Sequence, residues 1–117
     1  MKLPSPHRAV VDIRKLRDYC LDPRSPKGRD KARVFAAALR LTRADAESLR
    51  RALLQAAIEH DCHSGEADQH GRRYTVDFEL ETSAGRHCIR SGWIVRTGEA
   101  FPRLTTCYVI TAKRTGQ

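Results

Sequence analysis

The sequence predicts an α+β domain in which N-terminal helices pack on a C-terminal antiparallel β-meander of three or more strands. Apolar residues recur at helical spacing up to about residue 60, and after Gly71 they alternate with polar residues. Helices that precede strands, with short connections, are typical of the α+β class. The expected boundaries are an N-terminal extension at residues 1–9, a single domain at 10–111 and a C-terminal tail at 112–117.

Three helices are expected in the first half of the chain. The first spans roughly residues 10–21 and ends at two X-Pro pairs, because the residue before proline avoids helical geometry. The second covers 31–39 with Asp30 as N-cap, and the third begins at Thr42 with Asp45 as a capping-box partner. The apolar residues at helical spacing are Ile13, Leu16, Cys20, Val34, Phe35, Ala38, Leu39, Leu49, Leu53, Leu54, Ala57 and Ile58.

The second half predicts a loop followed by three strands. Residues 61–71 are polar and contain glycine, which indicates a loop. Alternation predicts strands at 74–80 and 88–95, joined by a hairpin loop at 82–86, and β-branched residues predict a third strand at 104–110. The expected core comprises Leu16, Val34, Phe35, Leu39, Leu49, Leu53, Ile58, Val76, Phe78 and Trp93.

Positive charge is concentrated at both ends of the chain. The 22 Lys/Arg and 14 Asp/Glu give a net charge of +8, divided as +7 in residues 1–40, −3 in 41–80 and +4 in 81–117. If the fold brings the two basic thirds together, their joint surface attracts polyanions, RNA or DNA first among them. The alternative is a solvated basic surface without a dedicated partner.

The cysteines and histidines do not form a recognisable metal motif. The four cysteines are widely spaced, without a Cys-x-x-Cys pair, and are expected to be free thiols. The cluster at 60–63 contains metal-ligand residue types but lacks a second ligand pair at zinc-finger spacing. We therefore expect neither a metal nor a cofactor.

Three passages carry a resemblance to a known family. They are Lys31-Ala32-Arg33-Val34-Phe35, Gly71-Arg72-Arg73-Tyr74 and Pro102-Arg103-Leu104-Thr105-Thr106-Cys107-Tyr108. With the strand around Trp93 between the last two, the chain resembles a small bacterial domain family of unassigned function. Members carry a Lys-Ala-x-x-Phe helix, a Gly-x-x-Tyr strand entry and a closing Thr-x-Tyr strand. The resemblance covers roughly residues 10–110.

A looser resemblance suggests a chemistry. Helices followed by a meander with a final Thr-x-Tyr strand are similar to the barnase/EndoU/colicin/RelE-type toxin ribonucleases, which cleave RNA without a metal. That resemblance implies attack of the ribose 2′-hydroxyl on the adjacent phosphate. The sequence departs from this group because His87 is the only histidine on its predicted strands. The acid and base are therefore not carried over.

The residues themselves suggest a site for this chemistry. Metal-free cleavage needs a base, an acid and cations around the phosphate, and histidine suits proton transfer near neutral pH. His70 is the preferred proton-transfer group, if the strands at 74–80 and 104–110 are neighbours, and the alternative is a solvated loop histidine. The full catalytic set is His70, Arg73, Arg103, Thr106 and Tyr108, and the nucleic-acid-binding set is Lys27, Arg29, Lys31, Arg33, Arg72 and Arg90.

Three side chains in these sets keep structural alternatives. Arg90 either lines a polar face of the sheet or pairs with Asp77 or Glu79. The alternative for Thr106 and Tyr108 is buried packing in the sheet. For the whole protein, the alternative to a ribonuclease is a non-catalytic basic module that binds nucleic acid or an acidic protein, such as an immunity protein or antitoxin.

The chain is not expected to enter a membrane. It lacks an apolar run near 18 residues, and proline and charge appear before a signal-type stretch could form. We therefore expect a cytoplasmic protein, or one delivered to a target-cell cytoplasm if it is a toxin module.

Overall fold

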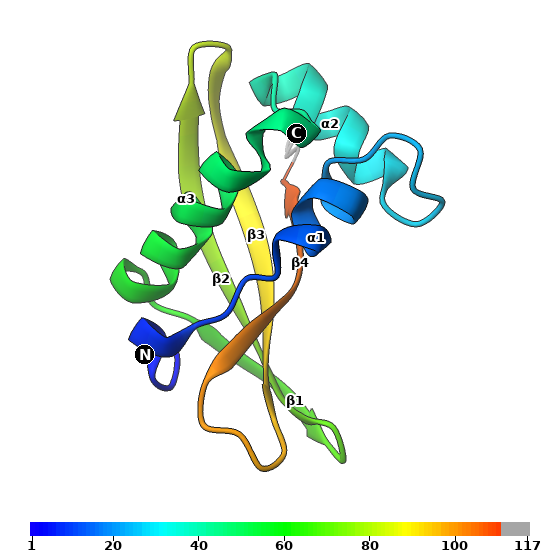
Figure 1. Ribbon diagram of the computed structural model, residues 1–117. Coiled ribbons are helices and arrows are strands. Elements are labelled where there is room, and N and C mark those ends of the chain that lie inside the picture. Colours follow the sequence, from blue (N-terminus) through cyan, green and yellow to red (C-terminus); the bar gives the residue numbers. More distant parts are fainter. Residues whose placement is uncertain (111–117) are drawn as a thin grey trace, which may run out of the picture.

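The helices lie on one face of a four-stranded antiparallel sheet, which confirms the predicted α+β class (Figure 1). The computed structural model describes residues 1–110, so the tail expected at 112–117 lies outside the described residues. The helical elements are η1 (Pro6–Arg8), α1 (Ile13–Lys15), η2 (Leu16–Cys20), α2 (Arg29–Leu39), η3 (Arg43–Asp45) and α3 (Ala46–Glu59). The strands, in sheet order, are β1 (His63–Asp68), β2 (Gly71–Thr82), β3 (Gly85–Arg96) and β4 (Pro102–Val109).

The first expected helix is short and changes its winding. Asp12 caps α1 by accepting a 3.0 Å hydrogen bond from the Arg14 N–H. η2 is a turn of π-helix, in which the Leu21 N–H donates to the Leu16 carbonyl at 2.8 Å. Such wide turns are rare and are frequently found at functional sites.

The two longer helices differ in how they begin. Asp30 is not the N-cap of α2, because the Ala32 N–H already donates to the Gly28 carbonyl and places Asp30 inside the first turn. The capping box of the third helix is confirmed, since the Asp45 carboxylate accepts from the Thr42 N–H at 2.9 Å. That first turn is the 3₁₀ element η3, and α3 continues it.

The sheet contains one strand that the sequence did not predict. Residues 63–68 form β1, paired antiparallel with the first half of β2, where a loop was expected. All six residues of β1 are exposed, so neither of its faces produces the alternation that reveals a strand. The hairpin between β2 and β3 is tighter than expected, because Thr82 pairs with Gly85 across a two-residue turn.

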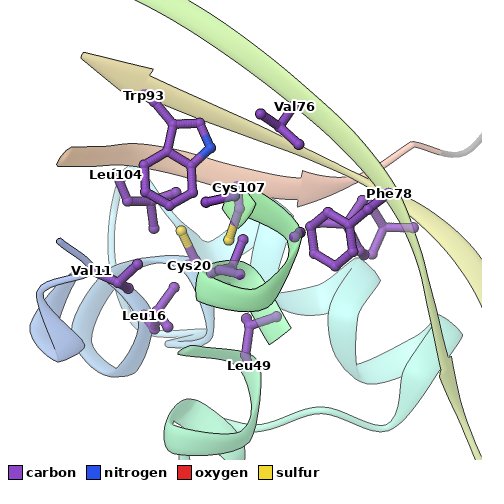
Figure 2. Close-up of a cluster of buried hydrophobic side chains, with 14 of the residues drawn as sticks. Val11, Leu16, Cys20, Leu49, Val76, Phe78, Trp93, Leu104 and Cys107 are labelled. Atoms are coloured by element: carbon purple, nitrogen blue, oxygen red, sulfur yellow. The ribbon is translucent and has the colours of Figure 1, made fainter. Parts of the chain in front are cut away.

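The core lies between the helices and the inner sheet face (Figure 2). Eight of the ten predicted core residues are buried, whereas Val34 and Ile58 are only half-buried. Val34 faces a hollow at the open side of β4, which explains its exposure. The segment expected to be an N-terminal extension contributes Leu3, which is 2% exposed, to this core.

A polar pair inside the core provides a stability prediction. Ser91 is fully buried, donates to the Val76 carbonyl at 2.7 Å and accepts from the Trp93 indole N–H at 2.9 Å. Ser91→Ala leaves the buried Trp93 indole N–H without its partner and removes the side-chain bond to the Val76 carbonyl, so we expect a loss of about 1–3 kcal/mol in the free energy of unfolding. Urea denaturation tests this against Ser64→Ala on exposed β1, and equal stability of the two variants would contradict it.

Candidate functional site

The five predicted catalytic residues do not form one cluster. Antiparallel pairing places Arg73, Ile94 and Arg103 in one row on the outer face of the sheet, the face away from the helices. Thr106 and Tyr108 lie further along β4, and the partner of Tyr108 is Arg90. At about 3.3 Å per residue, the row containing Arg103 and the row containing Tyr108 are roughly 13 Å apart.

His70 lies at the end of the sheet, in the exposed turn between β1 and β2. The backbone N–H of His70 donates to the Asp68 carboxylate at 2.8 Å, and the backbone carbonyl of His70 accepts from the Thr97 N–H at 3.1 Å. The strands at 74–80 and 104–110 are not neighbours, because β3 lies between them. His70 lies just beyond the pair of Gly71 and Arg96, the last pair at this end of β2 and β3. It is therefore roughly 20 Å along the sheet from the row of Tyr108.

Both arginines of the predicted catalytic set are held by carboxylates. Arg73 lies 2.9 Å from Asp68, and Arg103 makes two hydrogen bonds of 2.9 Å to Glu99. The Arg103 guanidinium holds the pKa of Glu99 below its usual range, so this carboxylate stays charged near neutral pH. A phosphate would have to displace these partners.

Arg90 satisfies both alternatives considered for it. It lies on the outer face and makes two hydrogen bonds to Asp77, at 3.0 and 2.9 Å. Asp77, with a smaller contribution from Tyr108, raises the pKa of Arg90 above its ordinary value. Asp77, Arg90 and Tyr108 thus form a continuous row across three strands.

Lys31 joins the final strand to the π-turn. Its ammonium lies 3.4 Å from the Tyr19 hydroxyl, 5.3 Å from the centre of the Tyr19 ring and 5.9 Å from the centre of the Tyr108 ring. A cation near two ring faces is attracted by both quadrupoles. Residues distant in the sequence therefore form one cluster where the start of α2 meets the end of β4.

Tyr19 is the member of this cluster that the sequence did not reveal. It lies in η2, one residue before the buried Cys20. Its only signal is an aromatic ring among charged neighbours ahead of a Pro- and Gly-containing turn.

Gly28 allows Tyr19 to take this position. A side chain at Gly28 would place its Cβ 1.9 Å from the Tyr19 carbonyl oxygen, which is far inside contact distance. Because the Tyr19 backbone is packed directly against this turn, the same turn sets the relative positions of Tyr19 and Lys31.

Gly28→Ala is therefore expected to destabilise the protein by roughly 1–3 kcal/mol, since the Tyr19 backbone must move to admit a methyl group. Thermal or denaturant unfolding measures this cost. Lys27→Ala is the matched control in the same turn, because Lys27 is exposed. A Gly28 variant as stable as the Lys27 variant would show that the turn relaxes freely.

The middle of β4 carries a bulge that contains two adjacent hydroxyl-bearing residues. Gly92 pairs with Thr106 and Trp93 with Leu104, so Thr105 is the additional residue. A Cβ on Gly92 would lie 3.0 Å from the Thr105 hydroxyl, which shows how closely the bulge approaches β3. Within residues 1–110, the Thr106 hydroxyl oxygen is buried and has no hydrogen-bond partner.

Three hollows follow β4, and we call them together the β4 groove. Their volumes are about 330, 480 and 90 Å³. Lys31 and Tyr108 line the first, Tyr19 lines the second, and Thr105 lines both the second and the third. The Lys31 cluster thus stands between the first two hollows.

The β4 groove brings the two basic thirds of the sequence together. Val10 pairs in parallel with Arg103 at the edge of the sheet. The Val10 N–H donates to the Pro102 carbonyl at 2.9 Å, and the Leu104 N–H donates to the Val10 carbonyl at 3.0 Å. The cationic side chains that line the groove are Arg14, Lys15, Lys27, Lys31, Arg96 and Arg103, against the carboxylates of Asp12 and Asp30.

The predicted nucleic-acid-binding residues are divided among several surfaces. Lys27 and Lys31 line the β4 groove. Arg33 lines a different hollow, on another side of α2, and Arg29 is exposed in the first turn of that helix. Arg72 donates to the Gly65 carbonyl at 3.2 Å in the hairpin of β1 and β2.

The remaining candidate ligands lie apart. Within residues 1–110, no group of three His, Cys, Asp or Glu side chains is arranged to hold a metal ion. All four cysteines are free thiols, and Cys20 and Cys107 lie together in the core (Figure 2). The adjacent Cys107 lowers the pKa of Cys20, while that contact and burial raise the pKa of Cys107. In the described part of the chain, no helix has the length and apolar character required to cross a membrane.

The comparison with protein families agrees with the resemblance seen in the sequence. The family model described as Domain of unknown function (DUF6883) matches residues 2–111. The chain belongs to this family, and its α+β domain is an example of the family's fold. No curated protein matches the chain.

Proposed function

We propose that the protein is a metal-independent endoribonuclease whose reaction centre is the Lys31 cluster in the β4 groove. The observation that carries the proposal is the position of the Lys31 ammonium near two tyrosine rings, at a hollow of the β4 groove. The next hollow, which Tyr19 lines, carries the further cations Arg14, Lys15 and Lys27. The looser resemblance to toxin ribonucleases supports the same reading, because Tyr108 ends the Thr-x-Tyr motif.

The cluster supplies the groups that the reaction requires. In the proposed step, the ribose 2′-oxygen loses its proton and attacks the adjacent phosphorus, while the bond from phosphorus to the 5′-oxygen breaks and that oxygen gains a proton. Lys31 stabilises the negative charge that develops on the phosphoryl oxygens. The Tyr19 oxygen takes the proton of the 2′-hydroxyl as its own proton passes to water. The Tyr108 hydroxyl donates the proton that the 5′-oxygen gains and recovers one from water. Tyrosine fills proton-transfer roles in other active sites.

The proposal moves the proton-transfer role away from His70. His70 and Arg73 lie toward the other end of the sheet and serve, in this scheme, at most to hold a distant part of the RNA. Arg103 lines the third hollow and extends the cationic path away from Lys31.

Cleavage of RNA in the presence of chelator tests the proposal. Purified protein with EDTA should convert single-stranded RNA to products ending in a 2′,3′-cyclic phosphate and a 5′-hydroxyl. DNA of the same sequence is the matched substrate control, because it lacks the attacking hydroxyl and should be bound but not cut. RNA that stays intact across pH 5–9 would contradict the proposal.

Binding without catalysis is the second candidate, and the ion pairs favour it. Three outer-face arginines, Arg73, Arg90 and Arg103, are already paired with carboxylates, which leaves fewer cations to stabilise a transition state. A binding surface needs only the basic groove.

Both candidates predict salt-dependent binding to single-stranded RNA. Each phosphate contact should contribute about −0.7 to the slope of log affinity against log salt. Lys15→Ala or Lys27→Ala should reduce the magnitude of the slope by about that amount, whereas Arg51→Ala, on exposed α3, should not. Affinity that does not change with salt would exclude the β4 groove as a phosphate-binding surface.

A further inference from the structure

A second groove lies on α2, away from β4. It has a volume of about 630 Å³ and an almost entirely apolar lining, and it runs between α2 and the segments that flank it. Ala36, Ala37, Leu21 and Leu41 contribute its apolar surface, and Arg33 and Arg43 stand at its rim. We call this the α2 groove.

The α2 groove and the β4 groove use different sides of one helix. At about 100° per residue, Arg33 and Ala37 project from the side of α2 opposite Lys31. Ala36 and Ala37 are exposed in the C-terminal half of the helix. An occupant of the α2 groove would therefore leave the Lys31 cluster open.

The rim and its surroundings are cationic. Residues 21–45, which contain the groove, hold seven basic and three acidic side chains. Arg43 is fixed in place by a 2.9 Å contact with Asp18 and a 2.8 Å hydrogen bond to the Arg17 carbonyl. The Arg33 side chain is 69% exposed, and its guanidinium lies 3.8 Å from the exposed carboxylate of Asp30. Such an exposed ion pair is weak, so a carboxylate of a binding partner can replace Asp30.

The geometry points to an amphipathic helix with an acidic flank, carried by another protein, as the occupant of the α2 groove. The alanines allow close approach of a second helix, and an apolar face set into such a groove is a recurrent mode of recognition. Acidic residues beside that face would meet Arg33 and Arg43. The groove is basic in every copy of the chain, so like charges oppose self-association through it.

The test uses a synthetic peptide of about 18 residues, roughly five helical turns, with leucines on one face and glutamates elsewhere. Fluorescence anisotropy measures its affinity for the full chain, and backbone NMR shifts locate the contact. We expect saturable binding with shifts centred on Ala36 and Ala37. The same peptide with lysines in place of glutamates should bind at least about tenfold more weakly.

Variants decide whether the α2 groove is responsible. Ala37→Glu places a carboxylate in the groove and should weaken binding of the acidic peptide at least about tenfold. Ser48→Glu is the matched control, because it adds the same charge to an exposed position on α3. If Ala37→Glu alters the circular dichroism spectrum, Arg33→Glu at the rim replaces it.

Three results would overturn the inference. Equal affinity for the lysine peptide would remove the charge argument, and shifts centred on β4 would move the contact elsewhere. A concentration-dependent dimer that Ala37→Glu dissolves, seen by sedimentation, would assign the groove to a second copy of the chain. None of these results depends on whether the protein cleaves RNA.

Discussion

Phe35→Ala is expected to lower the free energy of unfolding by about 3–5 kcal/mol, because it leaves a cavity in the middle of the core. Phe35 is completely buried on α2, on the side that packs against the sheet. The lost stability combines the transfer of the ring to water with the empty volume that neighbouring side chains fill only in part.

Phe101→Ala is the matched control for this substitution. Phe101 is half-buried in the connection between β3 and β4, where its ring contacts the guanidinium groups of Arg8 and Arg103 at 5.0 Å. Its loss should cost no more than about 1 kcal/mol. Denaturant titration gives both values, and a Phe35 cost as small as that of Phe101 would contradict the proposed packing of α2.

Lys31→Met should reduce the rate of RNA cleavage by about 10²–10³-fold at saturating substrate. Methionine has similar length but no charge, so the variant removes the cation that is proposed to stabilise the phosphorane. Because Lys31 is exposed enough to line a hollow and its alkyl chain is retained, the fold should not change.

Lys27→Met separates binding from chemistry. Lys27 also lines the β4 groove but lies in the turn before α2, away from Tyr108. Its substitution should raise KM and leave kcat nearly unchanged, whereas Lys31→Met should lower kcat. If both variants affect only KM, Lys31 is a binding residue and does not belong to the reaction centre.

The fold was predictable because its signals are local. Phe35 and Leu39 on α2 are at helical spacing, as are Leu49 and Leu53 on α3. The apolar residues of β2 alternate with polar ones. Each of these elements buries one face. β1 has no buried face, so its pairing with β2 leaves no pattern in the sequence. The prediction of Asp30 as the N-cap was wrong because α2 begins earlier, after Gly28. Gly28 has no side chain to cap the helix, so the sequence does not mark this start.

The candidate site was only partly predictable because it depends on strand order. Thr106 and Tyr108 were found through a motif, and Lys31 through its charge, but the meeting of Lys31 and Tyr108 requires the start of α2 to lie beside the end of β4. The choice of His70 required neighbouring strands, and the simple order of the meander places β3 between them. Tyr19 enters through a π-turn, a local irregularity that periodicity does not reveal.

The most direct test of the central claim compares Tyr108→Phe with His70→Ala in one chelated cleavage assay. Tyr108→Phe removes only a hydroxyl from the Lys31 cluster, and His70→Ala removes the imidazole at the other end of the sheet. We expect Tyr108→Phe to lower the rate of cyclic phosphate formation by about 10²–10⁴-fold, and His70→Ala to stay close to wild type. Full activity of Tyr108→Phe together with loss of activity in His70→Ala would contradict it.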